Sequence, residues 1–163
     1  MAWLDGILNW IFKDQLAGLR LEDPSPLLFR LPRDPARFLR ALPILAGPDA
    51  TVCFEGSTEE RVRRWLEEHG VPPRAKISAG TVLPVSDFYH VPLGPEALTG
   101  LAALVEAHGI ATPSIHVYVY EGERVTVAWY DAFYDHPVFI SRAVPAERVA
   151  AFAAAAGGEA VSS

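Results

Sequence analysis

Strict alternation of apolar and polar side chains over residues 115–120 and 124–130 constrains the fold of this chain more than any other feature. Successive side chains of a strand point to opposite faces, so the pattern predicts an antiparallel hairpin with one core face. The apolar residues of both strands lie on one face only if the numbers of two paired residues add up to an even number. The loop around Gly122 must then contain an odd number of residues. The predicted core face consists of Ile115, Val117, Val119, Val125, Val127 and Trp129.

The even-numbered positions of the hairpin predict a second, accessible face that binds a partner. Tyrosine can cover an apolar partner while its hydroxyl stays hydrogen-bonded, and it is enriched among binding hot spots. The stretch WYDAFYDHP at residues 129–137 follows, and its Asp and His side chains are typical of a polar turn at the end of this face. The predicted binding residues are His116, Tyr118, Tyr120, Tyr130, Asp131, Asp135 and His136.

The same region supports an alternative, a small-molecule-binding domain or hydrolase-like enzyme. His116, Asp131 and His136, with His90 from a nearby strand, are residue types used in general acid–base catalysis and in metal sites. Their spacing is not diagnostic, and the sequence contains no HExxH, GxSxG, P-loop or GxGxxG motif. We therefore assign no catalytic residue, metal ligand or cofactor from the sequence.

Two similar stretches, each a strand followed by a helix start, predict an α+β (mixed α/β) fold with helices packed on a central mixed or antiparallel sheet. Residues 28–35 (LFRLPRDP) and 88–95 (FYHVPLGP) both read as a strand, a cap residue and a proline suited to the first helical turn. This similarity indicates a duplicated βαβ…α unit, although helix caps alone also produce such matches. We predict one domain over residues 1–163. Its parts are an N-terminal helix (1–22), the two units (27–70 and 86–157), a further strand (75–83) and a flexible tail (158–163).

The N-terminal helix is unusually apolar, with a narrow polar stripe formed by Asp5, Asn9 and Lys13. Such a helix is expected to pack against the rest of the domain or against a second subunit. Membrane-surface binding is a weaker alternative, because no Lys or Arg residues flank the apolar face. The segment has no basic region or cleavage site of a signal peptide, and its polar residues interrupt any membrane span.

Composition narrows the classes of partner and the cellular location. The net charge is −6, so a nucleic-acid partner is not expected. Cys53 is the single cysteine and lies in an apolar run, which indicates a buried thiol. Because neither a signal peptide nor a membrane span is expected, the sequence predicts a cytoplasmic protein. Only two of the 14 basic residues are lysine, which is typical of a GC-rich bacterial source. The sequence favours a non-catalytic, protein-binding or self-associating domain of adaptor, inhibitor or immunity type.

Overall fold

The structure is a computed structural model that describes residues 2–162, except for the side chains of Ala2, Leu4, Asn9 and Ile11. Its helices are α1 (Ala2–Leu16), α2 (Pro35–Ala41), α3 (Glu60–His69), α4 (Thr99–Ala107) and α5 (Ala146–Ala156), with a 3-10 helix η1 at Leu42–Leu45. Its strands are β1 (Leu27–Arg30), β2 (Thr51–Glu55), β3 (Phe88–Pro92), β4 (His116–Glu121), β5 (Arg124–Trp129), β6 (Val138–Ile140) and β7 (Glu159–Ala160). The predicted α+β fold class is confirmed.

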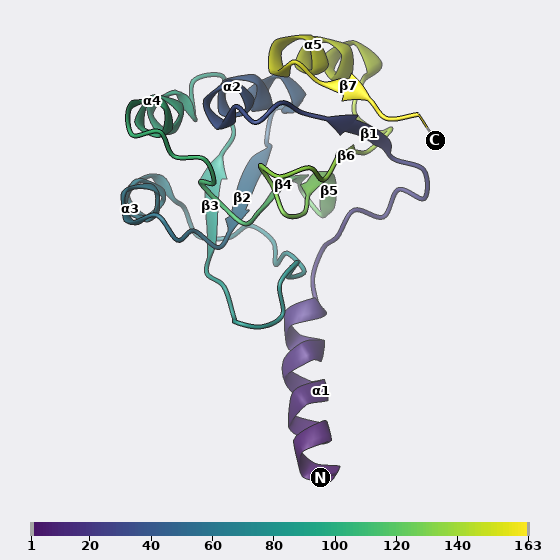
Figure 1. Cartoon of the computed structure of the whole chain (residues 1–163). Coiled ribbons are helices and arrows are strands. Elements are labelled where there is room, and N and C mark those ends of the chain that lie inside the picture. The colour runs from purple at the N-terminus through teal and green to yellow at the C-terminus, as the bar shows by residue number, and fades with distance from the viewer. Residues whose placement is uncertain (1, 163) are drawn as a thin grey trace.

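A seven-stranded sheet in the order β3-β2-β4-β5-β6-β1-β7 forms the centre of the molecule, and neighbouring strands pair antiparallel. Helices α2, α4 and α5 lie above one face of this sheet, with α3 beside them (Figure 1). The main apolar core lies between the helices and the sheet, and includes Phe38 of α2, Leu101 of α4 and Phe152 of α5. Asp34 Oδ1 accepts a hydrogen bond from Arg37 N at 3.1 Å, so the predicted cap of α2 is present.

The opposite face of the sheet is covered by chain without regular secondary structure. We call residues 71–87, between α3 and β3, the cover segment. The only pairings within it are isolated bridges, Leu19 with Ile77 and Val71 with His90. The strand predicted at residues 75–83 is therefore wrong. Ile77 instead packs with Tyr118, Tyr120 and Val125 in a second apolar cluster beneath the sheet.

The hairpin β4–β5 confirms the predicted core face for its inner half and corrects it near the turn. Val117 pairs with Trp129 and Val119 with Val127, and all four side chains are buried in the main core. The register then shifts, Tyr120 pairs with Val125, and the loop has two residues rather than an odd number. A β-bulge absorbs the extra residue. Val125 consequently lies on the second face with Tyr120, against the sequence prediction.

The predicted duplication is wrong in strand placement. Strands β1 and β2 of the first unit are separated in the sheet by β6, β5 and β4, whereas β3 and β4 of the second are separated by β2 alone. Helix α4 also begins at Thr99 rather than at Pro95, after a turn that starts at Gly94. Proline and glycine mark chain reversals in both units, so local signals alone explain the similarity.

Both ends of the chain differ from the sequence prediction. Helix α1 extends away from the body instead of packing along it (Figure 1), with Trp3 and Trp10 exposed. Packing of α1 against its own domain is therefore wrong, while packing against a second copy stays a prediction. Near the C-terminus, Glu159 and Ala160 form the edge strand β7 on β1, so these two positions do not belong to a flexible tail. Met1 and Ser163 lie outside the described residues.

Val127→Asp should unfold the protein or lower its free energy of unfolding by more than about 3 kcal/mol, because it places an unpaired charge in the main core. Chemical denaturation followed by circular dichroism measures the change. The control is Ala103→Asp, which adds the same charge on an exposed position of α4. Equal stability of the two variants would contradict the assignment of the core face.

Candidate functional site

Six polar or reactive side chains gather on the sheet face that lies opposite the helices. They come from three adjacent strands: Cys53 and Glu55 from β2, His90 from β3, and His116, Tyr118 and Tyr120 from β4. Strand pairing places Cys53 beside both His90 and Tyr118, and Glu55 beside His116. All six are buried. We call this set the polar cluster.

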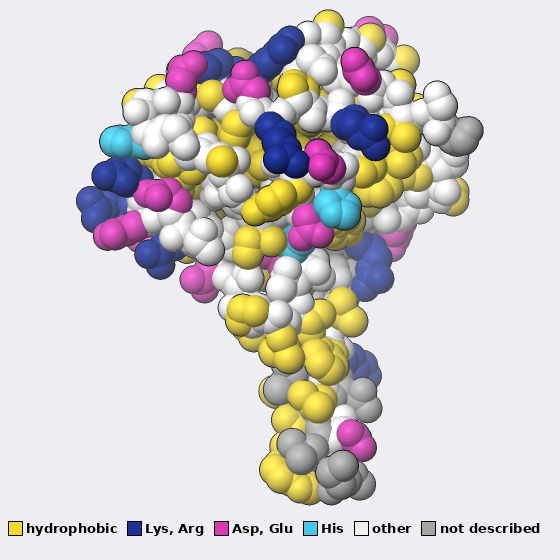
Figure 2. Space-filling view, in the orientation of Figure 1, with side chains coloured by type: hydrophobic (Ala, Val, Ile, Leu, Met, Phe, Trp, Pro, Cys, Tyr) yellow, Lys and Arg dark blue, Asp and Glu magenta, His cyan; other side chains and the backbone are white. Residues whose placement is uncertain are grey.

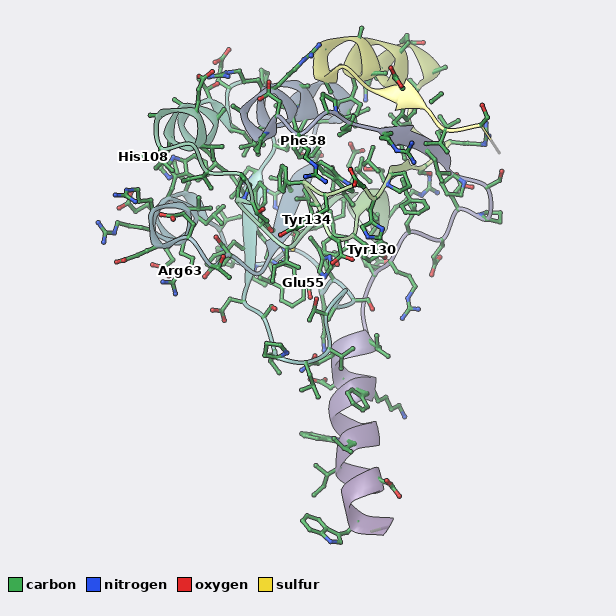
Figure 3. The ribbon with its side chains drawn as sticks, in the orientation of Figure 1. Phe38, Glu55, Arg63, His108, Tyr130 and Tyr134 are labelled. Atoms are coloured by element: carbon green, nitrogen blue, oxygen red, sulfur yellow. The ribbon has the colours of Figure 1, made fainter. Side chains whose placement is uncertain are left out.

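Glu55 is the centre of the polar cluster. Its carboxylate accepts hydrogen bonds from Gly80 N at 2.8 Å, Thr81 N at 3.0 Å and the Tyr118 hydroxyl at 2.6 Å. Hydrogen bonds to an ionised carboxylate are stronger than those between neutral groups. Glu55 thereby fixes the cover segment on the sheet. Figure 3 shows Glu55 below the sheet, whereas Phe38 lies on the side of the helices.

The hydrogen bonds of His116 define its tautomer. Its Nδ1 accepts a hydrogen bond from Asp131 N at 2.9 Å, so this nitrogen carries no proton. Its Nε2 lies 2.6 Å from Thr81 Oγ1 and donates to it. Burial lowers the pKa of His116 and outweighs the opposing effect of the charges on Glu55 and Asp131. His116 is therefore a neutral side chain that joins β4, the cover segment and the 129–137 loop.

A second chain of polar contacts joins Arg74, Tyr120, His90 and Cys53. The Tyr120 hydroxyl accepts from Arg74 N at 3.3 Å and donates to His90 Nδ1 at 2.8 Å. His90 Nε2 then points at Cys53 Sγ, 3.8 Å away. Burial lowers the pKa of His90 and raises the pKa of the Cys53 thiol. The thiol is thus a neutral, buried group and not an activated nucleophile, as its apolar sequence context predicted.

A cavity of about 700 Å³ opens between the cover segment and the base of α1. Its walls are mainly apolar and include Ile77, Val85 and Phe88, with His90 as the polar-cluster residue in its lining. Asp14 and Gln15 of α1 complete the wall. The cavity volume lies within the range typical of small-molecule sites, about 300–1,000 Å³.

The structure separates the predicted binding residues into a buried and an exposed group. His116, Tyr118 and Tyr120 are buried beneath the cover segment, so the prediction that they form an accessible face is wrong. Tyr130 lies at the boundary, with 37% of its surface exposed and its ring 5.8 Å from both His116 and Tyr118. Burial raises the pKa of Tyr130, and that of Tyr118 is raised by burial and by its hydrogen bond to Glu55.

The 129–137 loop is the polar turn that its composition predicted, and it is anchored by aromatic side chains. Phe133 packs against Phe38 and Trp129, while Asp131, Asp135 and His136 stay exposed. Asp131 and Phe133 adopt positive φ angles of 45° and 72°, which produce the tight reversal. The carboxylate of Asp135 pairs with Arg33, which follows β1, at 3.1 Å, and that of Asp131 pairs with His136 of the same loop at 3.7 Å. These exposed pairs contribute little stability.

The hypothesis of a His116–Asp131–His136 catalytic or metal site gains no support from this geometry. The unprotonated nitrogen of His116 already accepts a hydrogen bond from Asp131 N, whereas His136 is exposed at the surface and lies 3.7 Å from the Asp131 carboxylate. Across the residues that the structure describes, no three His, Cys, Asp or Glu side chains are placed to hold a metal ion. Comparison of the chain with protein-family models, curated proteins and solved structures found no significant match. Any function must be argued from the residues themselves.

Glu55 is the residue of the candidate site that sequence reasoning missed. It ends the run TVCFE, in which the other four side chains are all buried. A carboxylate at the end of a fully buried strand is a usable signal, since acidic residues are almost never fully buried without a partner. Its partners, however, lie 25 and 26 residues away at Gly80 and Thr81, in a segment with no periodic pattern.

Glu55→Gln should release the cover segment. The amide has one acceptor oxygen in place of two, so at least one of the N–H groups of Gly80 and Thr81 would face another donor. We expect faster hydrogen exchange over residues 73–86 and a loss of about 1–3 kcal/mol in stability. Glu67→Gln, on the exposed side of α3, is the matched control. Unchanged exchange in Glu55→Gln would show that Glu55 does not hold the segment.

Acid should destabilise the fold through His90 and His116. Their pKa values in the folded state lie below the unfolded value of about 6.5. Stability is therefore full above pH 7 and falls as pH decreases through about 6.5, because the unfolded state binds protons that the folded state does not. Denaturation measured from pH 8 to 5 tests this. His90→Gln and His116→Gln should each flatten the profile, and exposed His108→Gln should not; a profile that neither buried variant alters would contradict the assignment.

Proposed function

We propose that this protein is a non-catalytic, protein-binding domain that associates with a second copy of itself through the apolar surface of α1. The observation that carries this proposal is the exposure of large apolar side chains on a helix that extends from the body. Trp3 and Trp10 have 66% and 71% of their surface exposed. Ile7, Leu8 and Leu16 of the same helix are also exposed.

Such a surface is costly in water and favourable in an interface. Burying a large apolar side chain contributes about 1.5–3 kcal/mol, and tryptophan is among the residues most enriched in binding hot spots. Figure 2 shows hydrophobic side chains along the stalk formed by α1 that continue onto the adjoining part of the body. Contiguous exposed apolar surface of this kind marks an interaction site.

The charges of α1 favour a protein partner over a lipid or nucleic-acid surface. Lys13 is its single basic residue, beside Asp5 and Asp14, so α1 lacks the basic face of helices that bind anionic membranes. Within residues 2–162, no helix has both the length and the apolar character needed to cross a bilayer. The net charge of −6 also disfavours a nucleic-acid partner. We therefore propose that the protein associates with itself, in the cytoplasm.

A second candidate function is the binding of a small apolar molecule in the cavity at the base of α1. The cavity volume and the presence of His90 in its wall favour this candidate. Binding of a fluorescent apolar probe to a strictly monomeric protein would support ligand binding over self-association. The Val85→Trp variant, with a larger side chain at the cavity, should then bind the probe more weakly.

Trp10→Asp should convert a self-associating protein into a monomer without changing its fold. The charge removes an exposed anchor from the interface, while no core contact is lost. Sedimentation velocity over a concentration series measures the change, and circular dichroism checks the fold. Tyr134→Asp, at an exposed aromatic residue outside α1, is the control and should leave association unchanged. A wild-type protein that stays monomeric throughout the series would refute the proposal.

A further inference from the structure

The exposed apolar residues of α1 lead directly to the cavity at its base. Trp3, Ile7, Trp10 and Asp14 are spaced i, i+4, i+7 and i+11, so they follow one another along a single helix face. We call these four residues the Trp stripe. Asp14 ends the stripe and lines the cavity. The helix surface and the cavity therefore form one continuous site.

The rim of the cavity extends this site onto the body. Leu83 and Val85 of the cover segment have 60% and 68% of their surface exposed, and Val85 lines the cavity. Gln15 also belongs to the wall, but its Oε1 atom is closed off from solvent, and within residues 2–162 it accepts no hydrogen bond. The site thus offers apolar walls with the exposed carboxylate of Asp14 at its edge.

We propose that the cavity receives the N-terminal end of α1 from a second copy, with the two α1 helices packed antiparallel. This inference rests on the proposed self-association and specifies its geometry. The contact is two-fold symmetric, so each copy inserts the Trp3 end of its helix into the cavity of the other. Symmetric self-complementary contacts of this type close after two subunits.

The spacing of the Trp stripe fits this arrangement. When the stripe packs against itself in the antiparallel sense, Trp3 lies opposite Asp14 of the second copy and Ile7 opposite Trp10. Trp3 and Asp14 are 11 positions apart, which corresponds to about 16 Å at 1.5 Å per residue. The tip of one helix therefore reaches the level of the cavity in the other copy, where the Trp3 indole N–H can donate to the exposed carboxylate of Asp14, which also pairs with Lys76 at 3.1 Å.

A parallel pair of helices is disfavoured by shape. It brings both bodies to the same end of the helix pair, where each blocks the cavity of the other. The antiparallel pair separates the bodies and faces each carboxylate with an indole.

The area of α1 alone is too small for a stable dimer. A 15-residue helix offers a contact strip about 22 Å long and about 10 Å wide. Stable interfaces bury roughly 800 Å² on each partner. The cavity and its rim at Leu83 and Val85 supply the additional apolar surface, and they do so at both ends of the helix pair.

Disulfide cross-linking tests the orientation. An equimolar mixture of Trp3→Cys and Asp14→Cys should form a covalent dimer under mild oxidation, whereas each variant alone should not. Native Cys53 is fully buried and does not interfere. A second pair keeps the tryptophans intact: Gly6→Cys with Lys13→Cys, which flank the Trp stripe on one side and meet only in antiparallel packing. A Cβ at Gly6 contacts no atom within 4 Å, so this substitution fits.

The outcomes separate this inference from the proposed function. Cross-linking of Trp3→Cys with itself would show a parallel pair and overturn the inference. A wild-type dimer by sedimentation in which neither mixed pair cross-links would also overturn it, while self-association stands. A monomeric wild type would overturn both. Val85→Asp, at the exposed rim, should raise the dissociation constant of the dimer at least tenfold, whereas Tyr134→Asp should leave it unchanged. Equal dissociation constants for the two variants would show that the cavity is not part of the interface and would overturn the inference.

Discussion

The buried carboxylate of Glu55 is the interaction on which the lower half of the molecule depends. It lies on β2, between β3 and β4 in the sheet, and accepts hydrogen bonds from two backbone N–H groups of the cover segment and from Tyr118. The cover segment has no strand or helix of its own to satisfy its backbone groups, so side-chain acceptors take that role. Removal of Glu55 would leave those groups buried and unpaired.

Through the cover segment, the effect of Glu55 reaches α1. The last turn of α1 has carbonyl oxygens without helical partners, and the cover segment supplies donors for them. Ala79 N donates to Gln15 O at 2.9 Å, and Ser78 Oγ donates to Leu16 O at 2.9 Å. Lys76 adds a 3.1 Å ion pair with Asp14. The cavity, the base of α1 and the polar cluster are therefore one connected structure.

The sequence predicted the elements that are determined by interactions between residues close together in the chain. Hydrophobic alternation identified β4 and β5 and their core face, and Asp34 with Pro35 identified the start of α2. Alternation could not reveal the bulge near Tyr120, because a single extra residue changes the face without changing composition. Alternation also could not show whether the face that carries the tyrosines is exposed to solvent or covered by an irregular segment. Tyr118 and His116 satisfy their polar atoms with Glu55 and Thr81, contacts that depend on chain far away in sequence.

The sequence predicted that the apolar surface of α1 packs against its own domain or against a second subunit, and the body of the same chain leaves Trp3 and Trp10 exposed. Isolated helices of about 12–15 residues are marginal in water, and the described hydrogen bonds between α1 and the body lie in its last turn. In the proposed dimer, contacts along the Trp stripe would stabilise the helix itself as well as the association. Because Glu55 anchors the segment that holds the last turn of α1, a second copy on α1 would also stabilise the cover segment in its observed place on the sheet. Association and burial of the polar cluster would then be thermodynamically linked, and each would strengthen the other.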